Sequence, residues 1–316
     1  MPRDAISGPD RAAPGEVDRI NRVFSEAFTD RYQRDGLSGV RVPLLNPAIW
    51  RFAIEAAGEG ALVWRDGSGA IAAFNMVHRS GVEGWMGPLA VRPDRQGRGL
   101  GRTIVREGIR RLEAEGARII GLETMPRTVD NIGFYSRLGF RPGHLTVSVT
   151  RILSGSATPR AARFPAGPVA EIVARCRGLT DSLAPGVDFS REIELTLGQD
   201  LGGVTMVSER GAALAFALWH TAPLAEGRAG DEARVLKLAA RDIEGFRRLI
   251  PAIERDAASA GARQISLRCQ TAYTSAYEVL LDGGYLVHWT DLRMTLSGKP
   301  ELPAREGGVL FSNWEI

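Results

Sequence analysis

A hexapeptide at residues 96–101, QGRGLG, carries glycine at every second position between a strand-like run and a helix-like run. Backbone N–H groups at a helix N-terminus attract anions, and glycines let an anion approach them without a Cβ in the way. A Walker loop needs Lys and Ser/Thr after its last glycine, where this chain has Arg102 and Thr103. The dinucleotide fingerprint needs its third glycine at the position of Arg102. The loop therefore predicts a diphosphate ligand of another class.

Carboxylates on the neighbouring strand-like runs are candidate bases. Glu83 and Trp85 alternate onto one face of the run 83–92, and Glu123 lies near the end of the run 118–124. Either carboxylate could take a proton from a bound group, directly or through a water. Both positions also suit a solvated strand end, so the two interpretations stay open.

A proline interrupts the first of these runs. Pro88 lies in the segment GPLAVRP and removes a donor from the strand ladder, which is typical of a bulge or a strand edge. This segment, with the glycine loop after it, resembles the central motif of the GNAT superfamily of acyl-CoA-dependent N-acetyltransferases. The resemblance is strong over 83–142 and moderate elsewhere in 1–152. It implies that the strand splays from its neighbour and that the opening takes the pantetheine arm of acetyl-CoA.

The resemblance also implies a set of coenzyme A contacts. The backbone of Leu89, Ala90 and Val91 would bond the pantetheine amides, with one N–H facing the thioester oxygen as an oxyanion hole. The diphosphate would lie on the loop and the helix start, which comprise Gln96, Gly97, Arg98, Gly99, Leu100, Gly101 and Arg102.

A tyrosine completes the resemblance. The segment DNIGFYSRLGF, residues 130–140, matches the helix in which a GNAT tyrosine protonates the departing thiolate, and Tyr135 holds that place. Asn131 lies one turn earlier and is the matching coenzyme A contact, although the usual family pattern has asparagine seven residues before the tyrosine, where this chain has Thr128. The alternative for Tyr135 is an aromatic residue of the core.

These residues need a scaffold that hydrophobic periodicity predicts. Helices are expected over 15–33, 46–57, 99–115 and 129–138, and strands over 61–65, 70–79, 83–92, 118–124 and 143–152, with a last strand at 308–316. The fold class is α/β with a mixed sheet.

The chain also repeats itself at an offset of 145 residues. The segment AEGARIIGLET at 114–124 matches SAGARQISLRC at 259–269, and two later segments match at the same offset. A stretch rich in Gly, Ser and Pro at 154–168 is typical of a linker. We therefore expect two tandem GNAT-like domains, 1–153 and 169–316, each with a central mixed sheet, flanking helices and a splayed strand pair.

The second copy has lost the chemical groups of the first. Its glycine loop becomes ARDIEGF, with Asp242 and Glu244 where a diphosphate would lie, and Tyr135 and Asn131 map to Leu280 and Ala276. Like charges oppose phosphate binding. We expect a degenerate copy that shapes the acceptor cleft and binds no coenzyme A.

Composition narrows the function classes. The 40 basic and 37 acidic residues of this 316-residue chain are dispersed, which argues against nucleic acid, and no apolar run approaches the roughly 20 residues of a membrane span. Two distant cysteines and four scattered histidines offer no metal-ligand spacing. Only two basic residues are lysines, a bias associated with high-GC bacterial genomes. We expect a bacterial, cytoplasmic monomer or homodimer without a metal.

The sequence thus predicts an N-acetyltransferase that moves an acetyl group from acetyl-CoA to a primary amine by direct attack in a ternary complex. The acceptor is a small molecule or a peptide. Two alternatives remain: an acyl-CoA-binding regulatory module without turnover, and another acyl-CoA reaction on the same fold.

Overall fold

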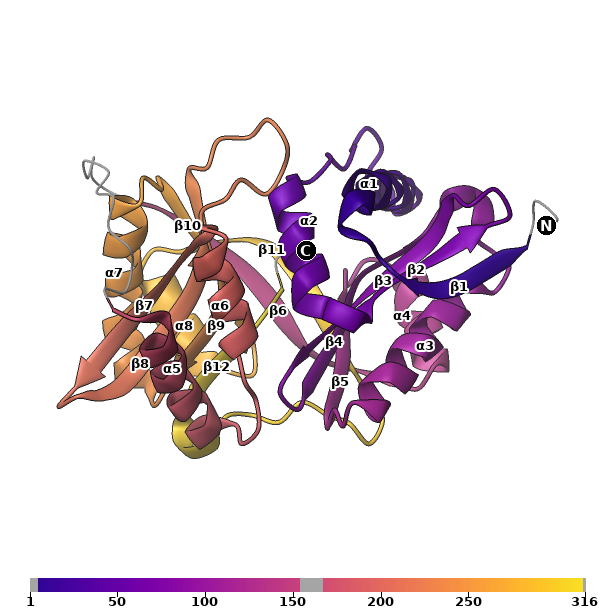
Figure 1. The fold of residues 1–316 in the computed structure, drawn as a ribbon. Coiled ribbons are helices and arrows are strands. Elements are labelled where there is room, and N and C mark those ends of the chain that lie inside the picture. Colours follow the sequence, from indigo (N-terminus) through magenta and orange to yellow (C-terminus); the bar gives the residue numbers. More distant parts are fainter. Residues whose placement is uncertain (1–4, 154–166, 315–316) are drawn as a thin grey trace.

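The computed structural model describes residues 5–153 and 167–314. Within the described residues, the first half of the chain forms six strands and four helices (Figure 1). In chain order they are β1 (Ile6–Arg11), α1 (Val17–Arg34), α2 (Pro47–Ala57), β2 (Ala61–Asp66), β3 (Ile71–Ser80), β4 (Glu83–Val91), α3 (Leu100–Ala114), β5 (Ile119–Thr124), α4 (Val129–Arg137) and β6 (Phe140–Ile152). Short 3-10 turns lie at Pro14–Glu16, Gly58–Gly60, Pro93–Arg95 and Arg305–Gly307.

The second half repeats the order of elements from α1 to β6 and adds one strand at its end. It comprises α5 (Val169–Leu183), α6 (Ser190–Gly198), β7 (Gly202–Glu209), β8 (Ala212–His220), β9 (Glu232–Ala240), α7 (Ile243–Ser259), β10 (Gln264–Gln270), α8 (Thr274–Asp282), β11 (Leu286–Leu296) and β12 (Val309–Ser312). Helices α4 and α8 begin and end at positions that differ by 145 residues, as do the first residues of β5 and β10. The repeat in the sequence is therefore a repeat in the structure.

All of these strands join one curled mixed sheet, in the order β1-β2-β3-β4-β5-β11-β6-β10-β9-β8-β7, with β12 paired to β9. The halves exchange their last long strands at its centre. Strand β11 of the second half lies between β5 and β6, and β6 of the first half lies between β11 and β10. The exchange brings side chains of the second half next to β5.

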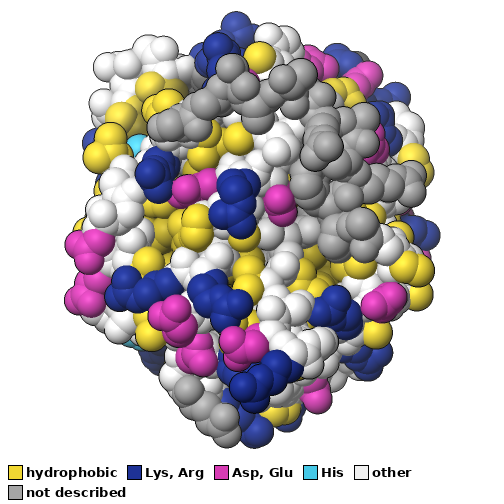
Figure 2. All heavy atoms as spheres, turned by 90° about the vertical axis from the view of Figure 1, so that its left-hand side faces the viewer, with side chains coloured by type: hydrophobic (Ala, Val, Ile, Leu, Met, Phe, Trp, Pro, Cys, Tyr) yellow, Lys and Arg dark blue, Asp and Glu magenta, His cyan; other side chains and the backbone are white. Residues whose placement is uncertain are grey.

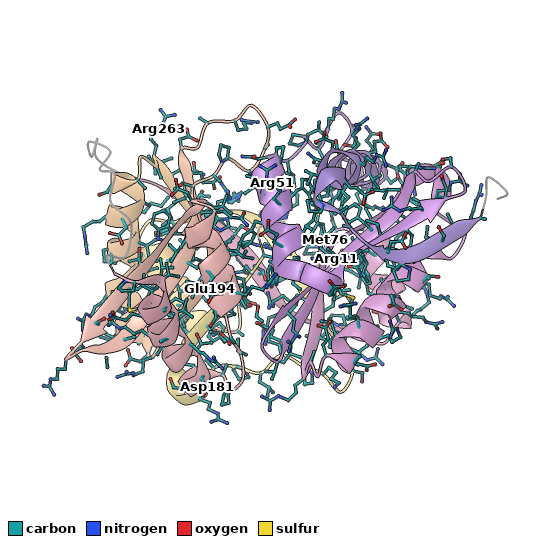
Figure 3. All side chains as sticks on the ribbon, in the orientation of Figure 1. Arg11, Arg51, Met76, Asp181, Glu194 and Arg263 are labelled. Atoms are coloured by element: carbon teal, nitrogen blue, oxygen red, sulfur yellow. The ribbon has the colours of Figure 1, made fainter. Side chains whose placement is uncertain are left out.

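Helices cover both faces of the sheet in each half. In the first half α1 and α2 pack on one face, around Phe74 and Met76, while α3 and α4 pack on the other, around Leu122 and Phe140. Gly108 sets how closely α3 approaches, because a Cβ there would meet Met86 Sδ at 2.4 Å. Figure 3 shows side chains filling the space between α2 and α6, where the two halves share a small apolar cluster.

The α/β class and the mixed sheet flanked by helices are confirmed. The predicted helices and strands of the first half correspond to the observed ones to within a few residues. Strand β1 was not predicted, and the last strand, predicted over 308–316, is observed as β12 over four residues. Most of the predicted linker lies outside the described residues.

The surface and the helices bear on two further expectations. On the face of the second half shown in Figure 2, basic and acidic side chains are interspersed and do not gather by sign. Among the described residues, no helix is long and apolar enough to cross a membrane.

Candidate active site

Strands β4 and β5 separate part-way along their length. Their parallel pairing begins at Glu83 with Ile119 and ends at Met86 with Leu122. The register between β3 and β4 shifts just beyond Met86, at Gly87 and Pro88, after which β4 continues to Val91 in contact with β3. Within the described chain, no strand pairs with this last part of β4 on its β5 side. The proline therefore does lie at a bulge, and an opening in the sheet follows it.

A cavity of about 670 Å³ occupies this opening and extends between the two halves. Residues of β4, β5 and α4 line one part of it, including Leu89, Ala90, Val91, Asn131 and Tyr135. Residues of the second half line the rest, including Arg268, Trp289, Asp291, Arg293 and Trp314. Residues of α1, on one face of the sheet, and of α4, on the other face, both line the cavity, which therefore extends through the sheet at the opening.

The glycine loop forms a backbone concavity at the start of α3. Gly97 and Gly99 have φ of +75° and +85°, which favour glycine, and a Cβ at either position would meet no atom within 4 Å. Gly99 is the N-cap residue of α3 and no side chain caps the helix, so its first N–H groups are available to an anion. Gln96 Nε2 donates to Val91 O at 3.0 Å and ties the loop to the end of β4.

The other residues predicted to contact the diphosphate differ in how exposed their side chains are. Leu100 is buried in the core under α3, whereas Arg98 and Arg102 are exposed beside the concavity, where a guanidinium suits a phosphate. Gln96 and Gly101 line the cavity itself. The structure thus brings the predicted diphosphate residues to one rim of the opening.

Tyr135 lies where β5 and α4 meet the opening. It is 7% exposed, its ring packs edge-on against Phe140 at 6.1 Å, and burial raises the pKa of its hydroxyl. No hydrogen bond to that hydroxyl is found within the described chain. Tyr135 therefore belongs to the core through its ring and to the cavity through its lining surface, so the two sequence interpretations are compatible.

Glu123 is held by groups of both halves. Its Oε1 accepts from Arg293 Nη1 at 2.7 Å and from the Thr146 hydroxyl, and its Oε2 accepts from Arg268 Nη2. Burial raises the pKa of this carboxyl, but the two guanidinium groups and the hydroxyl together lower it to about 2. A carboxylate that two arginines hold in its charged form is a poor proton acceptor. The contacts favour an anchoring role for Glu123.

Glu83 lies away from the opening, at the start of β4. It is 2% exposed and is not among the described residues that line the cavity. Its Oε2 accepts from the Ser312 hydroxyl at 2.7 Å, and Ser312 Oγ accepts from Lys237 Nζ at 3.0 Å. Lys237 Nζ in turn lies 3.8 Å from Glu192 Oε1. Burial raises the pKa of both Glu83 and Glu192. These contacts favour a structural cluster between the halves.

Family comparison agrees with this geometry. Residues 20–140 match the model of the acetyltransferase (GNAT) family. That span contains the bulged strand, the glycine loop and Tyr135. Residues 20–140 of the chain therefore belong to the GNAT acetyltransferase family. A search among curated protein sequences finds no match to the chain.

Solved structures share the GNAT fold over nearly the whole chain. A putative acetyltransferase from Pyrococcus horikoshii matches with a TM-score of 0.63 at 16% identity, covering 99% of this chain and 95% of its own. A GCN5-related N-acetyltransferase from Sphaerobacter thermophilus matches with a TM-score of 0.56 at 14% identity, and the match covers 96% of this chain and 98% of that one. Saccharomyces cerevisiae N-myristoyltransferase, solved with bound myristoyl-CoA, matches with a TM-score of 0.61 at 11% identity, and the match covers 99% of this chain and 80% of that one.

The second half has the elements of a GNAT unit, but its own opening is filled. Strands β9 and β10 pair from Glu232 to Val235, and beyond that point β12 pairs with β9 from Lys237 to Ala240. The start of α7 is also satisfied internally, because Asp242 Oδ1 accepts from Gly245 N at 2.7 Å. Leu280 and Ala276, the counterparts of Tyr135 and Asn131, are buried in the core.

Sequence reasoning missed the cavity residues that come from the second half, namely Arg268, Asp291 and Arg293. One signal could have found the first of them. Arg268 follows Glu123 by 145 residues, so the two occupy equivalent positions of the repeat and form an ion pair across the centre of the sheet. Asp291 and Thr146 are likewise 145 residues apart and are direct partners in the β6–β11 register.

Proposed function

We propose that the chain transfers an acetyl group from acetyl-CoA to a primary amine in the β4–β5 opening. One observation carries this proposal. A stretch of β4 that no described strand pairs on its β5 side lies next to an uncapped helix start, at one rim of one cavity. A thioester arm along β4 and a diphosphate on the loop fit this arrangement. GNAT membership, and a neighbour solved with bound acyl-CoA, support acyl-CoA as the donor.

The residues of the opening then have distinct roles. Backbone N–H groups of Leu89 to Val91 hold the arm, and one polarises the thioester carbonyl. The amine nitrogen bonds to the carbonyl carbon, the carbon–sulfur bond breaks, the sulfur takes a proton from the Tyr135 hydroxyl, and the nitrogen loses one proton to a base or to water. The hydroxyl is protonated at neutral pH and can donate, and because burial raises its pKa it is a weaker acid than an exposed tyrosine. Holding both reactants in one cavity accounts for direct attack without an acyl-enzyme.

Thiol release from acetyl-CoA, measured across a panel of primary amines with mass spectrometry of the products, tests the proposal. The expected result is amine-dependent release of CoA with an N-acetylated product. Tight acetyl-CoA binding without release for every amine would instead indicate a binding module without turnover.

A further inference from the structure

Asp291 lines the cavity, and its carboxylate can accept more hydrogen bonds than the described residues donate to it. Its Oδ2 accepts from Arg268 Nη2 at 2.9 Å and its Oδ1 accepts from Trp289 Nε1 at 3.3 Å. A carboxylate has about four accepting sites, so within the described chain roughly half of them have no donor. Burial raises the pKa of this carboxyl above its usual value, whereas two arginines and a hydroxyl outweigh burial at Glu123 and lower its pKa. Asp291 is therefore the better proton acceptor of the two.

Two aromatic rings stand beside this carboxylate. Trp289 and Tyr32 both line the cavity, with ring centroids 6.4 Å apart. Burial and then the negative charge of Asp291 raise the pKa of the Tyr32 hydroxyl, which places the carboxylate near it. Aromatic faces attract an ammonium group, and a carboxylate among them adds an ion pair.

The charges around Asp291 also favour a cation. Arg268 and Arg293 face three carboxylates, Glu123, Asp291 and Glu301. Within this group of five side chains the carboxylates outnumber the guanidinium groups by one, and a bound ammonium group would offset the excess negative charge. Two other arginines at the cavity have partners of their own, because Arg31 pairs with Asp35 and Asp130, and Arg234 donates to Ala222 O.

The register places Asp291 level with the expected thioester. Pairing between β4 and β5 ends at Met86 with Leu122, and pairing between β5 and β11 includes Thr124 with Leu292. Asp291 is therefore three residues beyond the Met86 level, and on β4, where the bulge at Gly87 and Pro88 adds one residue, Ala90 lies at that level. Asp291 also shares a sheet face with Glu123, since Arg268 bonds to both, while Leu122 packs with Tyr135 on the other face.

We infer that Asp291 binds the acceptor's primary ammonium group, flanked by Tyr32 and Trp289, and takes one of its protons so that the neutral amine can attack. The inference rests on the proposed acetyl transfer. The nitrogen–carbon bond then forms, the carbon–sulfur bond breaks, and the sulfur receives a proton from Tyr135. The nitrogen releases its second proton to water, which replaces the proton that Tyr135 gave up. The second half of the chain then supplies the acceptor side of the active site, although it binds no coenzyme A itself.

Ligand-observed NMR titration of the full chain with n-hexylammonium, and with 1-hexanol as its neutral analogue, tests the binding step. Wild type should bind hexylammonium in preference to hexanol, and Asp291→Asn should weaken hexylammonium binding by about 10- to 100-fold, as for a lost charged hydrogen bond. Asp282→Asn, an exposed aspartate of α8 in the same half, is the matched control and should change nothing. Equal binding of hexylammonium by wild type and Asp291→Asn overturns the inference, as does equal binding of the two probes by wild type.

A second variant and a rate measurement complete the test. If Asp291→Asn does not fold, Trp289→Leu should still weaken hexylammonium binding by about 2- to 5-fold, and unchanged binding overturns the inference. With hexylamine as acceptor, Asp291→Asn should lower kcat/KM by about 10²- to 10⁴-fold while acetyl-CoA affinity stays at the wild-type value. Wild-type turnover in that variant contradicts the proton-accepting role. Absence of turnover in wild type with every amine counts against the proposed function. The hexylammonium titration tests the ammonium site at Asp291 independently of turnover.

Discussion

The replacement Glu123→Gln separates an anchoring residue from a catalytic base. Glu123 has a pKa of about 2 in the folded chain against 4.5 for an ordinary glutamate. A shift of this size corresponds to about 3 kcal/mol of folding free energy at neutral pH. Losing one partner of a buried ion pair costs a similar roughly 3–5 kcal/mol. For a chain of 316 residues, 3 kcal/mol lowers Tm by about 5 °C.

The pH dependence of this effect has a fixed sign. Because the folded pKa is lowered, the stabilisation is fully present above the unfolded value of 4.5 and is lost as pH falls toward 2. Denaturant unfolding should therefore show a gap between wild type and Glu123→Gln of about 3 kcal/mol at pH 7, narrowing to about 1 kcal/mol at pH 3. Glu113→Gln, on the exposed side of α3, is the control and should leave stability unchanged. A Glu123→Gln variant with wild-type stability and no amine-dependent turnover would refute the anchoring role.

Two further substitutions test the donor side of the opening. Gly99→Asn should weaken acetyl-CoA binding, because its side chain would occupy space that the diphosphate needs, and it should leave Tm near the wild-type value, because asparagine tolerates a positive φ. Gly116→Asn, at φ +81° past the other end of α3, is the matched control. Equal acetyl-CoA affinities in the two variants would contradict a diphosphate site on the glycine loop. Tyr135→Phe should keep the packing against Phe140 and lower kcat toward the small end of ~10²- to 10⁴-fold, because a CoA thiolate is a fairly good leaving group. Tyr135→Ala should also lose roughly 3–5 kcal/mol of stability, and a Phe variant with wild-type turnover would remove the hydroxyl from the mechanism.

Local patterns in the sequence predicted local structure well. The period of apolar residues located α1 to α4 and β2 to β6, and the proline at position 88 predicted the bulge, because each depends on neighbours in the chain. Strand β1 escaped prediction because all six of its side chains are exposed and it contains Gly8 and Pro9, so it shows no alternation of apolar residues.

Pairing between distant strands could not be predicted in this way. Periodicity does not specify which strand lies beside which, so neither the exchange of β6 and β11 nor the insertion of β12 beside β9 was visible. The same limit left both Glu123 and Glu83 open as candidates for the base. Their partners Arg268, Arg293 and Ser312 all come from the second half. The two arginines lower the pKa of Glu123, whereas burial between the halves raises that of Glu83.

Calorimetric titration of the full chain with CoA tests the central claim, that the opening beside β4 is the acyl-CoA site and that β12 fills its counterpart beside β9. The structure predicts one equivalent of CoA per chain, since among the described helices only α3 begins with an uncapped glycine loop, whereas Asp242 caps α7. Two equivalent sites per chain, or no binding at all, would contradict it.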